Sequence, residues 1–360
     1  MKPYSVEVFT PQFQLVGNTC IDTVTYKEDY LSIGKNTITV FTMTGIEKQD
    51  YIRISGNGEE YAGIITEVSY GTEQSKKLQV ITYEPLMSIL NINILFDVNA
   101  QGVGGMEDYI ASQIQAALIE NGDALQNVPG LRVQTASQTM DWYLHITPSD
   151  TGGHYRIVNL LDSVIIPAME KYSIMVRARL NVTKKSIVMT IGCSVSGILT
   201  IESDLPNIIK KSVILRKTST DVNKLVLYNA TDYETAITYF LHSDLSYDKN
   251  DTNRVTPVFC DIRALSPEDG SSFESLAAKE ALSVFGNLAY SNLIELTVLK
   301  EDALVQPMNL EFGQVADIVS DGVAYRSILT GREIDAHMKL IFGTVRLDLT
   351  KLLRRDSNGQ

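Results

Sequence analysis

The chain has 360 residues, 44% of them hydrophobic and 21% charged, which indicates a folded protein of more than one domain. Its formal net charge of −12 disfavours non-specific binding to nucleic acid, because an acidic surface repels phosphates. The three cysteines (Cys20, Cys193 and Cys260) lie far apart and form no CxxC pair, so neither a zinc site, a redox motif nor disulfides are expected. No apolar run approaches the ~18 residues of a membrane span, and the first residues lack the apolar core of a signal peptide.

The first hundred residues are rich in short alternating segments. Strands are expected before residue 45 at Val6–Thr10, Gln12–Val16, Thr23–Tyr26, Tyr30–Ile33 and Thr37–Thr44. About seven strands within roughly 80 residues are typical of an antiparallel barrel or sandwich.

Residues 51–90 form the clearest module of the chain. Tyr51–Ser55 alternates with the period of a half-buried strand, and Gly56-Asn57-Gly58 supplies residues that tolerate positive φ in a tight turn. Tyr61–Tyr70 and Leu78–Tyr83 are the next expected strands, and the apolar segment Leu86–Leu90 follows them.

The pattern changes to α+β near residue 101. Gly102-Val103-Gly104-Gly105 leads into a helix with an apolar face from Met106 to Leu118. A second helix carries an apolar stripe from Ile157 to Ala168, and Pro167 is expected to bend or end it. Strands at Ser173–Leu180 and Ser186–Cys193 complete this part.

From residue 204 the chain returns to strands, expected at Ile208–Lys217, Lys224–Tyr228, Thr235–Leu241, Val258–Ile262 and Asn292–Leu299. The polar stretch His242–Thr256 reads as a loop. Ser271 to Glu274 matches a capping box and predicts a helix that ends at Gly286.

The last stretch repeats the order of the 51–90 module: strand, tight turn, strand, polar turn, strand and leucine-rich tail. The expected segments are Gly313–Val319, Ser320-Asp321-Gly322, Val323–Thr330, Gly331–Ala336, Met338–Val345 and Leu347–Leu353. Sequence identity is low, so a chance similarity of two β meanders is the alternative to a duplication.

No motif in the chain indicates a catalytic, cofactor-binding or metal-binding residue. His145, His154, His242 and His337 stand outside HExxH, Gly102–Gly105 lacks the third glycine and the lysine of a phosphate-binding loop, and no serine lies in GxSxG. The acidic residues Asp244–Asp251 lack the spacing of a calcium loop. Carboxylate pairs such as Glu59-Glu60 are placed in turns.

Four segments resemble the opening of siphophage and prophage tail-tip proteins, the tail-associated baseplate-hub family of phages of Gram-positive bacteria. They are Val6-Glu7-Val8-Phe9, Leu15–Asn18, Tyr26–Leu31 and Gly63–Thr66. The order of a barrel, an α+β insert, a second barrel and a small terminal element is similar along the whole chain.

This resemblance implies a fold of two similar antiparallel β-barrel-like domains with an inserted α+β domain and a small terminal element. The expected division is 1–100 for the first barrel, 101–203 for the insert, and 204–270 with 288–360 for the second barrel and terminal strands. Residues 271–287 are expected to be a helix-containing insertion.

The implied function is that of a structural tail protein, a homotrimeric baseplate hub without enzyme activity or cofactors. It would sit in the virion tail after assembly in the host cytoplasm, and three chains with two barrels each would match the sixfold ring of the distal tail protein. Tape measure and receptor-binding proteins are further expected partners, and DNA would pass through without specific binding. Relatives with a C-terminal hydrolase or receptor-binding region leave a cell-wall-degrading or receptor-binding tail component as the alternative.

Overall fold

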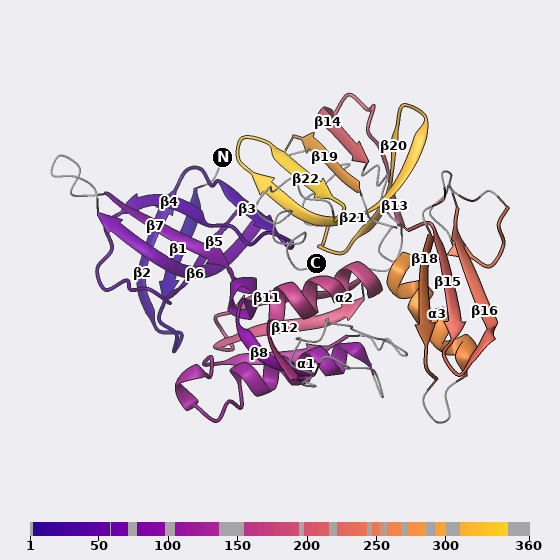
Figure 1. Cartoon of the computed structure of the whole chain (residues 1–360). Coiled ribbons are helices and arrows are strands. Elements are labelled where there is room, and N and C mark those ends of the chain that lie inside the picture. The colour runs from indigo at the N-terminus through magenta and orange to yellow at the C-terminus, as the bar shows by residue number, and fades with distance from the viewer. Residues whose placement is uncertain are drawn as a thin grey trace.

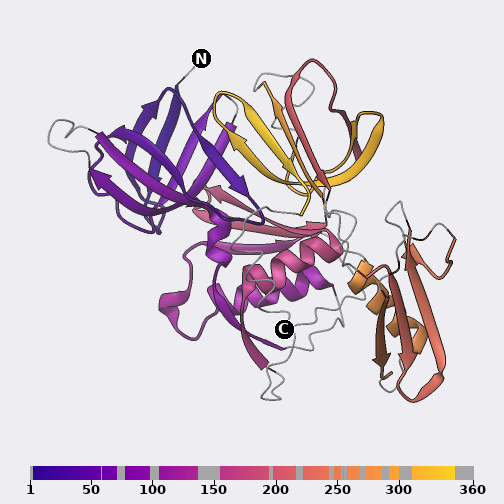
Figure 2. The same ribbon diagram turned by 45° about the horizontal axis from the view of Figure 1, so that its top comes forward.

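The computed structural model describes residues 3–57, 59–70, 78–97, 105–136, 155–193, 198–215, 222–242, 247–252, 254, 258, 260–267, 272–285, 292–299 and 310–344. Strands dominate, as expected. Two curled β sheets lie side by side, an α+β part packs beneath them, and a smaller sheet with one helix lies to one side (Figures 1 and 2).

The first β unit is a curled sheet of six strands in the order β2-β1-β5-β6-β7-β4. Its strands are β1 (Tyr4–Phe9), β2 (Leu15–Ile21), β4 (Asn36–Phe41), β5 (Tyr51–Gly56), β6 (Glu59–Tyr70) and β7 (Leu78–Pro85). The burial of β4 alternates strictly, with Asn36, Ile38 and Val40 inside. This period of two aims one face of the strand into the core. The short strand β3 (Tyr26–Asp29) leaves this sheet and pairs elsewhere.

The second β unit has six strands in the order β13-β20-β21-β22-β19-β14, and β3 adds to it as the seventh. Its strands are β13 (Ile198–Glu202), β14 (Ile208–Leu215), β19 (Asn292–Val298), β20 (Val315–Ser320), β21 (Val323–Ile334) and β22 (Met338–Phe342). Both β units contribute to one hydrophobic cluster, in which Tyr61 and Tyr83 of the first unit join Leu340 and Phe342 of the second.

Each β unit contains a hairpin, and the two hairpins pair their residues in the same register. Tyr51 pairs with Ile64 and Gly56 with Glu59 in the first unit, while Val315 pairs with Ile328 and Ser320 with Val323 in the second. Every equivalent position is therefore 264 residues further along the chain, as from Tyr51 to Val315.

The match extends to the irregular positions. The turn residues Asn57 and Asp321 both have a φ of 52°. The two 12-residue strands β6 and β21 both shift register at the same place, between Ile65 and Glu67 and between Leu329 and Gly331. A bulge bends a strand and strengthens its twist. The predicted recurrence of the 51–90 module therefore holds as far as the third strand.

The middle unit combines two helices with two small sheets. Strand β8 (Asn93–Asp97) pairs with β10 (Tyr155–Asn159), and β9 (Leu131–Thr135) and β11 (Ile174–Asn181) flank β12 (Ser186–Cys193). Helix α1 (Met106–Leu118) and the helical pair η4 (Leu161–Ile165) and α2 (Ile166–Tyr172) cover them, with the short turn η3 (Ala124–Gln126) at the surface. Pro167 is the second residue of α2 and lies directly after the π-helical turn η4, so the helical pair continues through it and its irregular turn comes just before it.

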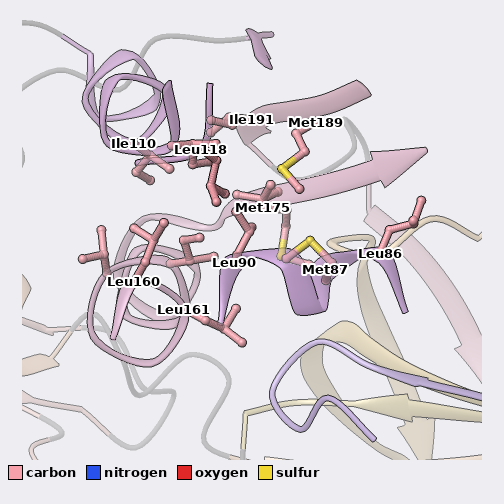
Figure 3. Close-up of a cluster of buried hydrophobic side chains, with 14 of the residues drawn as sticks. Leu86, Met87, Leu90, Ile110, Leu118, Leu160, Leu161, Met175, Met189 and Ile191 are labelled. Atoms are coloured by element: carbon pink, nitrogen blue, oxygen red, sulfur yellow. The ribbon is translucent and has the colours of Figure 1, made fainter. Parts of the chain in front are cut away.

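The segment after β7 anchors the first β unit to the middle unit. It forms the 3₁₀ helix η2 (Leu86–Leu90), whose Leu86, Met87 and Leu90 are buried. Figure 3 shows these side chains beside those of Leu160 and Met175 in one apolar cluster.

Residues 224–285 form a unit of their own, the α3 unit. Its sheet runs β17-β16-β15-β18, from β15 (Lys224–Asn229), β16 (Asp232–Leu241), β17 (Tyr247–Asp248) and β18 (Cys260–Leu265). Helix α3 (Phe273–Phe285) packs on it around Leu225, Leu227 and Phe285, and the Ser272 hydroxyl accepts the capping bond from Ser275 N–H. The separate sheet and its hydrophobic cluster thus group α3 with residues 224–265, whereas the sequence placed those strands with the second barrel.

Several local predictions differ from the structure. Tyr30–Ile33 is a turn instead of a strand, because the Asp29 carboxylate accepts the Leu31 N–H at 2.9 Å. Strand β2 begins at Leu15, after a turn in which Phe13 has a φ of 62°. Gly331–Ile334 belongs to β21 because both β22 and β3 pair with it, so the turn comes only at Asp335. The predicted tail Leu347–Leu353 lies outside the described residues.

Gly63 in β6 offers a test of how closely the first β unit is packed. A Cβ at this position would collide with the Glu84 carbonyl oxygen and the Tyr83 ring. We expect Gly63→Ala to destabilise the protein by about 2 kcal/mol, because backbone and a buried ring must move. Gly122→Ala is the control, since nothing lies within 4 Å of a Cβ there. Chemical denaturation measures both, and an equal effect of the two would contradict the packing described.

Candidate functional site

The structure brings the two β units together through one strand. β3 follows the second half of β21 in antiparallel register, from Gly331 opposite Asp29 to Ile334 opposite Tyr26. Just beyond the strand, Tyr30 N–H donates to the Thr330 carbonyl oxygen at 2.8 Å. A strand that leaves the sheet of one unit to extend the sheet of the other fixes their relative position through main-chain hydrogen bonds.

The side chains of Arg332 and Glu28 also connect the two β units at this junction. Arg332 Nη2 lies 3.1 Å from Glu28 Oε2, and the guanidinium lies 5.3 Å from the centre of the Phe312 ring. About a quarter of the Arg332 side chain is exposed. Burial would lower the pKa of Arg332, but the Glu28 carboxylate outweighs it and raises that pKa above its usual value.

Four tyrosines surround the pair and are buried: Tyr26, Tyr30, Tyr61 and Tyr83. Burial raises the pKa of each of them well above its ordinary value of 10.0. The Tyr30 hydroxyl accepts the Val176 N–H at 3.0 Å and so ties the middle unit to the same place. The Tyr83 hydroxyl has no hydrogen-bond partner among the described residues.

A row of ion pairs continues the junction at the surface. Lys27 Nζ lies 2.7 Å from Glu333 Oε1, and Lys339 Nζ lies 3.1 Å from both Glu333 Oε2 and Glu295 Oε1. Burial would raise the pKa of Glu333, but the two ammonium groups hold it below its usual value. The row links strands β3, β21, β22 and β19, so it connects both units.

A cleft of about 410 Å³ opens where the two β units meet the middle unit. Its wall includes Glu59, Glu60, Arg177, Arg179 and Glu311. Glu311 lies 3.1 Å from each arginine, and Glu59 accepts the Tyr4 hydroxyl at 2.8 Å. Glu59 and Glu60 were expected in a turn, but they begin β6 and line this cleft. Glu311 of the second unit pairs with the two arginines of the middle unit, which suits a junction.

Of the residues weighed as candidates from the sequence, the described ones come together only as the pair His242 and Asp248. His242 Nε2 lies 2.9 Å from Asp248 Oδ1, and His337 sits in the turn before β22. His145, His154, Gly102–Gly104 and Asp244 lie outside the described residues. Cys20 and Cys260 are exposed and free.

Within the described ranges, no group of three or more His, Cys, Asp or Glu side chains is placed to hold a metal ion. No helix in that part of the chain has the length and apolar character to cross a membrane.

Comparison with known proteins places the fold. No protein-family model matches the chain, and no curated protein matches it in sequence. The chain is similar in structure to the 43 kDa tail protein of prophage MuSo2 from Shewanella oneidensis, with a TM-score of 0.55 and 8% identity over 96% of this chain and 98% of that one.

Two further tail proteins have a similar structure. A tail protein from Neisseria meningitidis MC58 gives a TM-score of 0.53 and 11% identity, over 95% of this chain and 97% of that one. The prophage tail protein gp18 from Listeria monocytogenes EGD-e gives 0.51 and 11%, over 98% of each. The chain therefore has the fold of prophage tail proteins from end to end, which confirms the resemblance and the mostly β fold class expected from the sequence.

The Arg332–Glu28 pair can be tested against a matched pair in the same strand. Arg332→Met leaves Glu28 largely buried without its partner, and we expect a loss of stability of about 2 kcal/mol. Arg326→Met is the control, because Arg326 pairs with Asp317 within the second unit and is 56% exposed, where a loss below about 1 kcal/mol is expected. Urea unfolding at neutral pH measures both variants, and a larger loss for Arg326→Met would contradict the role given to the junction.

The buried tyrosines predict a loss of stability in alkali. Because the folded protein keeps Tyr83 neutral while the unfolded chain ionises near pH 10.0, stability is full below pH 10 and falls as the pH rises above it. Tyr83→Phe removes a buried hydroxyl without a partner, so it should leave stability at pH 7.5 unchanged or higher and reduce the alkaline loss. The control is Tyr233→Phe, whose ring is 67% exposed. An equal alkaline loss in Tyr83→Phe and the parent protein would count against this account.

Proposed function

We propose that the protein is a structural component of a phage tail, the homotrimeric hub that closes the distal end of the tail tube. The observation that carries this proposal is the hairpin repeated at an interval of 264 residues, with its two copies fixed side by side by β3. The fold shared with three tail proteins, two of them from prophages, supports it independently.

The repeat within each chain would let a threefold ring match a sixfold neighbour. A ring of three identical chains has threefold symmetry, but two similar units per chain give it six similar faces. Such a ring can dock onto a sixfold neighbour, for which the distal tail protein is the proposed partner. The tape measure and receptor-binding proteins are further proposed neighbours.

The net charge fits a channel through which DNA moves. With a formal charge of −12, the protein repels the phosphate backbone more than it holds it. In this proposal the hub opens for ejection, and the DNA slides past without being bound.

The proposed division into domains follows the sheets and cores. The first β unit (residues 1–90) and the second β unit (198–215 and 292–344) form the ring. The middle unit (93–193) and the α3 unit (224–285) lie beside it as insertions, and neither carries out a reaction in this proposal.

The test is the mass of the protein in solution. Light scattering over a series of concentrations should reach three times the 39.9 kDa of one chain. Addition of the distal tail protein should convert any remaining monomer into a complex of three chains with one sixfold ring. A protein that stays monomeric with that ring present and that degrades cell-wall material would contradict the proposal, and would favour the alternative of a hydrolytic tail component.

A further inference from the structure

The long strands β6 and β21 each change neighbours along their length. The first half of β21 pairs with β20, and its second half pairs with β22 on one edge and with β3 on the other. The bulge between Leu329 and Gly331 turns the second half away from β20 and frees the edge that β3 then occupies.

In β6 the same edge is not occupied by any strand of the described residues. Tyr51–Gly56 pairs with β6 as far as Ile64, β7 takes the other edge as far as Tyr70, and the bulge falls at the equivalent place. Glu67–Tyr70 is the equivalent of Gly331–Ile334. On the side away from β7, no strand among the described residues pairs with it. An unpaired edge of this kind is a template for a further strand.

The side chains at the paired edge of β21 are buried, whereas Tyr70 at the equivalent edge of β6 is exposed. Ile334 is 1% exposed and its partner Tyr26 is 2% exposed, both covered at the junction within the chain. Tyr70, which holds the position of Ile334, is 64% exposed. The first β unit thus leaves an aromatic ring uncovered where the second unit has a buried side chain.

The internal repeat also identifies the strand that would fill this edge. β3 is placed next to β4 by the Asn36 side chain, which donates to the Lys27 carbonyl oxygen and accepts its N–H. In the second unit, β19 takes the place of β4: Asn36 is opposite Tyr83 and Ile294 is opposite the equivalent Phe342. The strand beside β19 is β14, in which Val213 lies opposite Ile294. Val213 is therefore the equivalent of Lys27, and β14 is the equivalent of β3.

The outer edge of β14 is unpaired among the described residues. The strand ends the sheet of the second unit, pairs with β19 on one side, and carries no further strand on the other side within the described part of the chain. β3 runs antiparallel to the strand β21 of the unit that it joins, so its equivalent β14 is expected to run antiparallel to the strand that it joins.

We propose that the outer edge of β14 in one copy of this chain pairs antiparallel with Glu67–Tyr70 of β6 in the next copy. The register follows from the junction within the chain: Glu333 opposite Lys27 becomes Ser69 opposite Val213, and Ile334 opposite Tyr26 becomes Tyr70 opposite Ser212. This inference rests on the proposed trimer and deepens it, because it names the strands that join the protomers.

The consequence is a ring in which neighbouring β units contact one another in the same way, within a chain and between chains. Within a chain, β3 of the first unit adds to the sheet of the second unit. Between chains, β14 of the second unit adds to the sheet of the first unit of the next copy. The contact is head to tail, and such contacts close a ring when the rotation per joint is right. Tyr70 becomes covered in the process.

Disulfide crosslinking between copies tests the register. In the chain, Tyr30 and Thr330 form a hydrogen-bonded pair, so Lys27 and Glu333 three positions on form a non-hydrogen-bonded pair, the kind with the closer Cα atoms. Ser69 and Val213 inherit this geometry, which suits a disulfide. Chains with Ser69→Cys are mixed with chains with Val213→Cys, both in a background with Cys20→Ser and Cys260→Ser, and oxidised under the conditions in which the trimer forms.

Two controls frame the result. Lys27→Cys with Glu333→Cys in one chain should form its disulfide within the monomer, since these positions are opposite each other in the structure. Ser212→Cys in place of Val213→Cys moves the thiol to the other face of β14, and should give about tenfold less crosslinked product.

We expect a covalent pair of chains from the Ser69→Cys and Val213→Cys mixture, and a covalent ring of three when both substitutions are in one chain. A trimer by light scattering whose crosslinking does not exceed that of the Ser212→Cys control overturns this pairing and leaves the proposed hub intact. Chains that remain monomeric even with the distal tail ring overturn the hub, and the pairing with it.

Discussion

The pairing of β3 with the second half of β21 is the constraint on which the arrangement of the chain depends. It is made of main-chain hydrogen bonds between segments about 300 residues apart in sequence, with the Glu28–Arg332 pair beside it. Without it, the two β units would be connected only through the middle unit. With it, they share a hydrophobic cluster and keep one mutual orientation.

The bulges in β6 and β21 make that pairing possible. A straight 12-residue strand would keep the same neighbour along each edge. The register shift at Leu329 turns β21, so that its pairing with β20 ends at Ile328 and its pairing with β3 begins at Gly331. The same shift at Ile65 gives the first unit a strand with the same bend. The irregularity is thus the feature that the duplication has kept most faithfully.

Local sequence was enough to predict the hairpins and not enough to predict how they meet. Alternation in Tyr51–Ser55 and the residues Asn57-Gly58 specify a strand and a tight turn from short-range effects alone, and Asp321-Gly322 does the same in the second copy. Gly331 to Ala336 has the polar, glycine-containing composition of a turn, but Gly331–Ile334 pairs with β22 on one edge and with the distant β3 on the other, and so continues the strand. The cleft and its charged groups follow from that same long-range contact, so Glu59, Glu311 and Arg332 carried no signal in the sequence.

What the two copies keep in common is backbone geometry more than side chains. Between residues 49–70 and 313–334, identical residues occur only at Ile54/Ile318, Gly58/Gly322, Tyr61/Tyr325, Ile64/Ile328 and Thr66/Thr330. Yet Gln49 and Gly313 both have positive φ, at 74° and 85°, and both donate N–H to the equivalent carbonyl oxygens of Ile65 and Leu329. Gln49 holds a conformation that glycine adopts more easily, so the hydrogen bond and the sheet around it outweigh the local preference. A fold specified in this way tolerates wide exchange of side chains, which is why structures that share 8–11% of their residues with this chain can be matched along nearly its whole length.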